Sequence, residues 1–203
     1  MPELGGDTPI ETCLSESSLV GFTGIELAGK FPRNPRIIKF LLSKHKLTLP
    51  GGWYGSRLRE KSVEEEWLSM QDQIRLLQDL NSSVFIFGDV SGSIQGEVNT
   101  ALSNRPQLNH NEWKEYCQKI SEISKRLDDV GLPMSYHQHM GTIIQTEIEV
   151  EKFLEANPSF KLQPIETVEA SIQMPEGQKD FLRLNPFEHG TDGFFVACLV
   201  KDL

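Results

Sequence analysis

The sequence predicts an α/β protein built on a parallel β-sheet, and it favours part of a (β/α)₈ barrel. Helix-capping sequences alternate with short apolar segments, which is typical of parallel strands joined by helices. The continuous apolar segment Val84–Phe87 is typical of a strand buried on both faces. Gly92–Gly96 has the wrong spacing for a phosphate-binding loop, which argues against an open nucleotide-binding sheet. Because a complete barrel usually needs about 250 residues, the 203 residues are expected to hold a partial one.

Helices are predicted where a capping residue precedes apolar residues at helical spacing. The first opens at Thr8, with Pro9 at its first position, and runs toward Val20. Asn34 caps the second, whose buried face is expected to be Ile37, Ile38, Leu41 and Leu42. Ser62 opens the third, which carries Trp67, Met70, Ile74 and Leu77. Asn109 opens the fourth, which Gly131 ends and which carries Trp113, Tyr116, Ile120, Ile123 and Leu127.

Four strands are predicted between these helices: Gly24–Leu27, Leu47–Gly52, Val84–Phe87 and Leu132–Tyr136. Because helices connect them, the strands should be parallel and joined by right-handed crossovers. A further helix is expected to start at Thr142 or Thr146 and to continue through Val150 and Phe153. After about residue 157, strand-like pieces separated by Pro, Gly and acidic residues predict a small β-rich tail: Phe160–Ile165, Phe181–Leu184 and Phe194–Lys201, with a hairpin turn at Gly190–Gly193.

Composition excludes several classes of protein. The net charge of −9 argues against nucleic acid as a partner, because an acidic chain repels phosphate backbones. The three cysteines lie far apart and form no CxxC motif, which argues against a disulfide framework or a zinc site. The N-terminus lacks the basic and apolar regions of a signal peptide, and the longest apolar run, Phe194–Val200, is too short to span a bilayer. We therefore expect a cytoplasmic protein without a membrane partner, and homo-oligomerisation stays open.

Candidate site residues follow the predicted strands, since functional groups of β/α barrels lie at the carboxyl ends of the strands. These positions carry Glu26, the pair Trp53 and Tyr54, Asp89, and the pair His137 and His139. Carboxylates and imidazoles can transfer protons, and aromatic faces can bind the C–H surfaces of a polar ligand. We therefore expect Glu26, Asp89, His137 and His139 to be catalytic, and Trp53 and Tyr54 to bind substrate.

Each of these residues also has a structural interpretation. Glu26 and Asp89 could be solvated strand ends or members of ion pairs, and Trp53 and Tyr54 could belong to the core or its rim. The histidines give the sharpest signal, because residues two apart on a strand point the same way and neutral imidazole is both a metal ligand and an acid/base near pH 7.

Five segments in combination resemble inosose dehydratases, which belong to the xylose isomerase-like barrels. They are MPELGGDTPIETCLSE, GFTGIELAGKFPRNP, GGWYGSRL, VSGSIQG and YHQHMGTIIQTE, and the resemblance covers about residues 1–152. It implies a carbon–oxygen lyase of inositol catabolism that removes water from a keto-inositol to give a cyclic dione. The implied ligands are a cyclitol or sugar substrate and a divalent metal, manganese or cobalt. His137 lies where a relative's metal-binding Glu would be.

The chain also departs from that family. Relatives have a strand before MPELGG, and Gln138 interrupts a stretch that is often all histidine. Most metal ligands of these barrels come from strands after the YHQHMGT segment, and the sequence leaves the family there. We therefore expect a barrel truncated at both ends, with weak metal binding and no measurable dehydration by this chain alone.

Residues 153–203 resemble the C-terminal strands of bacterial ribosomal-RNA cytosine-5 methyltransferases. The segments that carry this resemblance are FLEANPSFKLQPIE and FLRLNPFEHGTDGFFVACLVK. The S-adenosylmethionine loop and the Pro-Cys or Thr-Cys settings of those enzymes are not in this sequence, so no methyltransferase residue is carried over. Two alternatives to a dehydratase therefore stay open: a non-catalytic chimera, and a remnant of an RNA-modifying protein.

Overall fold

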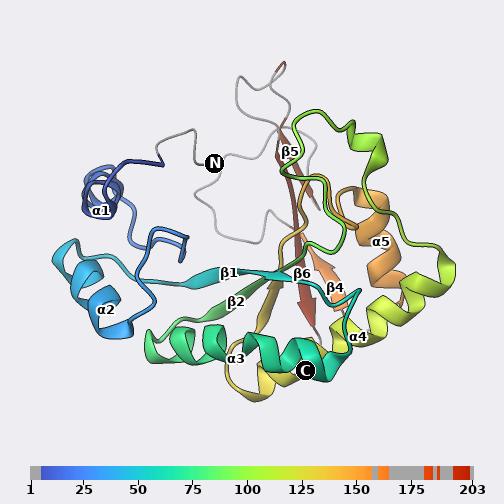
Figure 1. Ribbon diagram of the computed structural model, residues 1–203, viewed down its shortest axis with the longest axis horizontal. Helices are drawn as coiled ribbons and strands as arrows, with labels where there is room; N and C mark the ends of the chain where they lie inside the picture. The colour runs from blue at the N-terminus through green and yellow to red at the C-terminus, as the bar shows by residue number, and fades with distance from the viewer. Residues whose placement is uncertain (1–5, 157–159, 165–180, 185–186, 188–193, 202–203) are drawn as a thin grey trace. The chain divides into compact units, whose positions relative to one another are not determined.

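The protein divides into two compact units, Met1–Gln145 and Thr146–Leu203, which are described here one at a time. The computed structural model describes residues 6–156, 160–164, 181–184, 187 and 194–201 (Figure 1). The predicted domain boundary at residues 152 and 153 falls inside helix α5, Glu147–Ala156, which belongs to the second unit.

The first unit is built on a three-stranded parallel sheet in the order β1-β2-β3 (Figure 1). The strands are β1 (Gly51–Ser56), β2 (Val84–Asp89) and β3 (Met134–Tyr136). The predicted parallel pairing between the Val84 and Leu132 strands is confirmed: β2 and β3 are parallel, and Phe85 lies opposite Met134. The α/β fold class with parallel strands is therefore confirmed as well.

The first two predicted strands need correction. Gly24–Leu27 forms no regular strand and makes only two isolated parallel bridges, one from Gly24 to Thr48 and one from Leu27 to Gly52. The strand predicted at Leu47–Gly52 begins at Gly51 and continues to Ser56. The apolar pattern ends at Gly52, but backbone pairing with β2 continues, and this carries Trp53 and Tyr54 into the strand.

Four α-helices accompany this sheet: α1 (Ile10–Leu19), α2 (Pro35–Lys44), α3 (Val63–Asp79) and α4 (His110–Asp129), with a 3₁₀ turn η1 at Leu102–Asn104. Ser62 and Asn109 form the predicted capping boxes with Glu65 and Glu112. The N-cap predicted at Thr8 is wrong. Pro9 is the N-cap of α1, and its carbonyl accepts the backbone N–H of residues 12 and 13 without any side-chain cap.

The core of the first unit lies between the sheet and its helices. All five apolar residues predicted on α4 are buried, as are Met70, Ile74 and Leu77 of α3, while Trp67 is half-buried. On α2, Ile38, Leu41 and Leu42 are buried but Ile37 is 48% exposed, so the prediction for Ile37 is wrong. Ile37 directly precedes the buried Ile38, and one residue along a helix turns the side chain by about 100°, away from the buried face.

The second unit contains α5 and an antiparallel sheet in the order β4-β6-β5. Its strands are β4 (Phe160–Gln163), β5 (Phe181–Leu184) and β6 (Phe194–Lys201), so the predicted strands are confirmed, with the first one shorter than expected. The backbone N–H of Thr146 donates to Glu149 Oε2 at 2.9 Å, which favours Thr146 over Thr142 as the start of α5. The predicted turn at Gly190–Gly193 lies outside the described residues.

Within the residues that the structure describes, no helix is both long enough and apolar enough to cross a membrane.

Candidate active site

The two faces of the β1-β2-β3 sheet carry different residues, because side chains alternate along each strand and residues paired across parallel strands point the same way. One face, here the Trp53 face, carries Trp53, Gly55, Ile86, Gly88 and, just beyond β3, His137. The opposite face, here the Tyr54 face, carries Tyr54, Ser56, Phe85, Phe87, Asp89 and Tyr136. Helices α3 and α4 run along the sheet (Figure 1), and Tyr116 of α4 contacts Tyr136 on the Tyr54 face.

Three of the predicted site residues meet on the Trp53 face, and a fourth, Glu26, contacts the backbone of Trp53. The His137 ring packs edge-on against the Trp53 indole, with centroids 5.0 Å apart and planes at 84°. His139 lies 6.2 Å from the same indole and stacks on His137 at 5.7 Å. The Glu26 carboxyl accepts a hydrogen bond from the backbone of Trp53. An indole and two imidazoles therefore gather near the carboxyl end of the sheet, with a carboxylate bound to the backbone of the indole's own residue.

The surroundings of this cluster change the pKa values of two of its side chains, His137 and Glu26. Desolvation lowers the pKa of the His137 imidazole below its ordinary value, and the nearby His139 lowers it further. Desolvation raises the pKa of Glu26, although the hydrogen bond from the Trp53 backbone opposes this change. The lowered pKa favours the neutral form of His137, and the raised pKa favours the protonated form of Glu26.

The orientation of His139 follows from a bond to its neighbour. Its Nδ1 lies 3.0 Å from the Met140 carbonyl oxygen. Because a carbonyl oxygen only accepts hydrogen bonds, this contact requires a proton on Nδ1.

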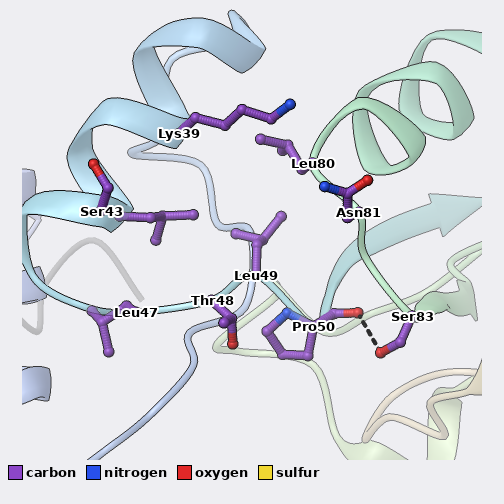
Figure 2. Close-up of a pocket in the computed structure, with 10 residues that line it drawn as sticks. Lys39, Ser43, Leu47, Thr48, Leu49, Pro50, Leu80, Asn81 and Ser83 are labelled. Atoms are coloured by element: carbon purple, nitrogen blue, oxygen red, sulfur yellow. Dashed lines mark hydrogen bonds between the residues drawn. The ribbon is translucent and has the colours of Figure 1, made fainter.

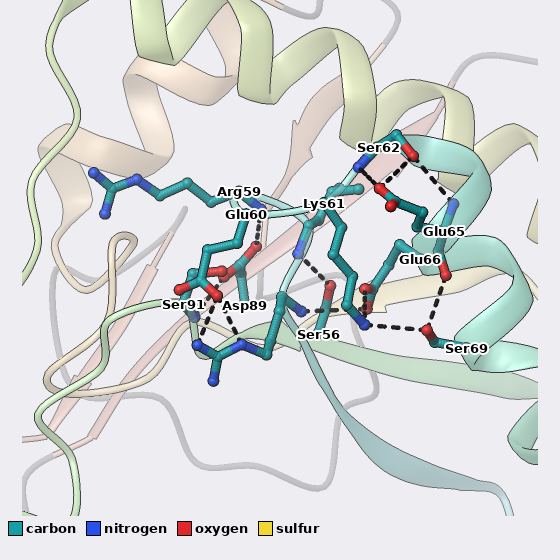
Figure 3. Close-up of polar contacts among 12 residues, drawn as sticks. Ser56, Arg59, Glu60, Lys61, Ser62, Glu65, Glu66, Ser69, Asp89 and Ser91 are labelled. Carbon is teal, nitrogen blue, oxygen red and sulfur yellow. Dashed lines mark hydrogen bonds and ion pairs between the residues drawn. The ribbon is translucent and has the colours of Figure 1, made fainter.

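Asp89 does not join this cluster. It is only 1% exposed and lies on the Tyr54 face. Its Oδ2 accepts the backbone N–H of Arg59 at 3.1 Å, and its Oδ1 accepts that of Ser91 at 2.8 Å (Figure 3). Burial raises the pKa of Asp89, and the bonds from Ser91 and Arg59 oppose that shift. In this position Asp89 joins the loops that follow β1 and β2.

Tyr54 also points away from the cluster. Its ring lies 5.6 Å from Phe85 and 6.4 Å from Phe87, on the helix-covered side of the sheet. Burial and the nearby Glu66 carboxylate raise the pKa of the Tyr54 hydroxyl. Although Tyr54 follows Trp53 directly in the sequence, a single step along a strand reverses the face.

A buried carboxylate that the sequence analysis missed supports the same region. Glu66 of α3 is fully buried and accepts the backbone N–H of Arg57 at 3.2 Å, while Lys61 Nζ pairs with its other oxygen at 3.1 Å (Figure 3). Glu66 precedes Met70 by four positions, which places it on the buried stripe of α3. That spacing could have revealed it.

The donor set does not fit a complete metal site. No three His, Cys, Asp or Glu side chains in the described part of the chain are grouped so that they could hold a metal ion. His137 and His139 stack as neighbours, whereas a catalytic divalent metal typically takes about three protein ligands. The assignment of His137 as a metal ligand stays a prediction.

A cavity of about 620 Å³ lies elsewhere, at the amino ends of β1 and β2 (Figure 2). Leu42, Leu49 and Leu80 form its apolar part, and Lys39, Asn81 and Ser83 are among its polar residues. Pro50 and Ser83, which also line it, directly precede β1 and β2. In β/α barrels this end serves stability rather than catalysis, so we place the candidate active site at the opposite end.

Solved structures define the class of fold. The first unit is part of a xylose isomerase-like (β/α)₈ barrel. A xylose isomerase-like barrel protein from Mycobacterium smegmatis, in complex with magnesium, matches 71% of this chain and 51% of its own length, with a TM-score of 0.51 and 13% identity. A probable 3-DHS dehydratase of petrobactin synthesis from Bacillus anthracis matches 72% of this chain and 53% of its own, with a TM-score of 0.52 and 13% identity.

Curated relatives add similarity in sequence. The chain is 37% identical over 154 residues to the rhizopine catabolism protein MocC of Rhizobium meliloti, covering 76% of this chain and 47% of MocC. It is 34% identical over 163 residues to the inosose dehydratase of Bacillus thuringiensis, covering 78% of this chain and 54% of that enzyme. The chain therefore spans about half the length of these relatives. No family model matches it.

Proposed function

We propose that this chain forms the substrate-binding and proton-transfer part of a barrel dehydratase that acts on a keto-inositol. One observation carries the proposal: the rings of Trp53, His137 and His139 gather near the carboxyl end of the sheet, and the Glu26 carboxyl is hydrogen-bonded to the Trp53 backbone. The same chain is 34% identical to an inosose dehydratase over 163 residues. The fold also resembles that of a probable 3-DHS dehydratase. These likenesses favour elimination of water as the reaction.

Elimination of water from a keto-inositol needs one base and one acid. The base removes the proton from the carbon beside the carbonyl, and the next carbon loses its hydroxyl group as water when the acid protonates it. The resulting enol then tautomerises to the dione. Neutral His137, which its lowered pKa favours, has the free lone pair that a base needs, and the protonated form of Glu26, which its raised pKa favours, would supply the proton.

Trp53 has the role of a binding surface in this proposal. Its half-buried indole offers an apolar plane to the C–H face of a cyclitol ring, while the imidazoles beside it can accept hydrogen bonds from hydroxyl groups. A divalent metal, when bound, would polarise the carbonyl group. Because the described residues supply no complete ligand set, we assign no step to a metal.

Tryptophan fluorescence can test substrate binding directly. Replacing Trp67 and Trp113 with Phe leaves Trp53 as the only tryptophan of the chain. Titration with a keto-inositol should then change its emission saturably, with a dissociation constant on the order of 1 mM, as for a small ligand with few contacts. His137→Ala should weaken binding about tenfold, whereas Tyr54→Phe, on the opposite face, should not. No saturable change, or equal losses in both variants, would contradict the proposal.

Metal binding and catalytic turnover need separate tests from substrate binding. We expect calorimetric titrations with manganese and cobalt to show weak binding, and an absorbance assay to show no dione product from this chain alone, because a third metal ligand is lacking among the described residues. Tight one-to-one metal binding, with turnover abolished by His137→Ala, would show instead that the chain holds a complete catalytic site.

Two alternatives to a dehydratase concern the C-terminal residues. The resemblance of residues 153–203 to ribosomal-RNA methyltransferases stays a hypothesis, as does a non-catalytic chimera. Saturable binding of S-adenosylmethionine to the full chain would support the methyltransferase alternative.

A further inference from the structure

Gly88, near the carboxyl end of β2, lies directly under the indole of Trp53. A Cβ atom added to Gly88 would stand 2.1 Å from Cη2 of Trp53, 2.6 Å from Cζ3 and 3.0 Å from Cζ2. Distances this short do not occur between carbon atoms that are not bonded to each other. The indole can therefore occupy its position only while residue 88 has no side chain.

The position of the indole explains how it reaches His137. Trp53 pairs with Ile86 in the sheet, so its ring leans from β1 across β2 and two residues toward the carboxyl end. The backbone N–H of His137 donates to the Phe87 carbonyl at 2.8 Å, which ties the histidine to the same part of β2. Trp53 and His137 consequently meet over Gly88, with ring centroids 5.0 Å apart.

Gly55, the residue paired with Gly88, provides an internal comparison. A Cβ atom on Gly55 would lie 3.6 Å from Nε1 of Trp53 and 3.5 Å from Val90, which are ordinary contacts. The indole thus lies against two paired glycines, but only one of them must lack a side chain. Neither glycine has a positive φ, so backbone strain does not explain the difference.

We infer that Gly88 is a positioning residue of the candidate site: it holds the Trp53 indole against His137 and so sets the shape of the surface that receives the substrate. The ligand part of this inference rests on the proposed function, whereas the geometric part does not. Gly88 itself touches no reacting atom in this account. Its effect is transmitted entirely through the placement of Trp53.

Gly88→Ala and Gly55→Ala, each made in the chain whose only tryptophan is Trp53, form the matched test. Gly88→Ala should shift the Trp53 emission maximum and remove the nuclear Overhauser effects between the Trp53 and His137 rings. It should also weaken keto-inositol binding at least about tenfold, because a displacement of about 1 Å disturbs a preorganised site strongly. Gly55→Ala should leave all three readouts close to those of the parent.

A stability cycle covers the case in which Gly88→Ala folds poorly. Overpacking of this kind should lower the melting temperature of the full chain by about 5 °C. In a Trp53→Ala background the same substitution should lower it by less than about 2 °C, because the clashing ring is gone.

Equal losses in both backgrounds, or ring contacts unchanged by Gly88→Ala, would overturn the inference. If the parent chain binds no keto-inositol, the proposed function fails. The emission, ring-contact and stability readouts still decide the role of Gly88 in that case.

Discussion

The two faces of the β1-β2-β3 sheet use similar residue types for different purposes. On the Tyr54 face, Asp89 is 1% exposed and both of its oxygens accept backbone N–H groups. On the Trp53 face, His137 is exposed to solvent and packs against the indole ring, while the exposed Glu26 carboxyl contacts the Trp53 backbone. Polar groups that are fully hydrogen-bonded stabilise loops, whereas polar groups with free lone pairs can bind a ligand.

The comparison shows that position at a strand end does not define a site residue. Asp89 and His137 both follow apolar residues at the carboxyl end of the sheet, but their side chains lie on opposite faces. The alternation of side chains along each strand decides which of them can meet a substrate. Two substitutions, one pH titration and one direct measurement can break or sharpen this division.

Glu66→Ala should have the largest effect on stability. It removes a fully buried carboxylate that accepts the Arg57 N–H and pairs with Lys61. Because Lys61 is partly exposed, we expect a loss of about 3 kcal/mol of unfolding free energy in urea, the lower end of the range for a broken buried pair. Glu64→Ala, which removes an exposed carboxylate from the same helix turn, is the control and should leave stability nearly unchanged.

Asp89→Asn should have a smaller effect. An amide can accept only through its oxygen, so its NH₂ group would face the backbone N–H of Arg59 or of Ser91. We expect a loss of about 1–3 kcal/mol, together with faster hydrogen exchange at one of these two amides. Keto-inositol binding should survive. Normal stability with abolished binding would instead place Asp89 in the active site.

The pH dependence of His137 should give the smallest change. Its pKa is lowered in the folded protein by desolvation and by His139, so the unfolded chain takes up this proton more readily. Stability and keto-inositol binding should therefore hold above the ordinary pKa of about 6.5 and decline as the pH falls through the lowered folded value. A titration of the His137 ring protons by NMR checks the sign: a midpoint above 6.5 would be inconsistent with it.

Local signals in the sequence predicted much of this fold. The capping boxes at Ser62 and Asn109 were found because every group that forms them lies within four residues. The end of β1 was missed because the glycines and polar residues at 51–56 give no apolar pattern, although they pair with β2 throughout. That error placed Trp53 and Tyr54 in a loop and hid their opposite orientations.

The site itself was predictable only in part. Glu26, Trp53 and His137 were identified from their positions after predicted strands, and the structure brings them together. Gly88 could not be found in this way, because its importance depends on a ring that reaches it from another strand. Glu66 was passed over because a charged residue on a helix is usually exposed.

The central claim is that Trp53 and His137 share one face of the sheet, whereas Tyr136 and the Tyr116 of α4 that contacts it lie on the opposite face. Nuclear Overhauser effects in the chain with Trp53 as its only tryptophan test this most directly. The account predicts strong cross-peaks between the Trp53 indole protons and the ring protons of His137, whose centroids lie 5.0 Å apart. Cross-peaks from Trp53 to Tyr116, with none to His137, would place the indole on the opposite face and contradict the account.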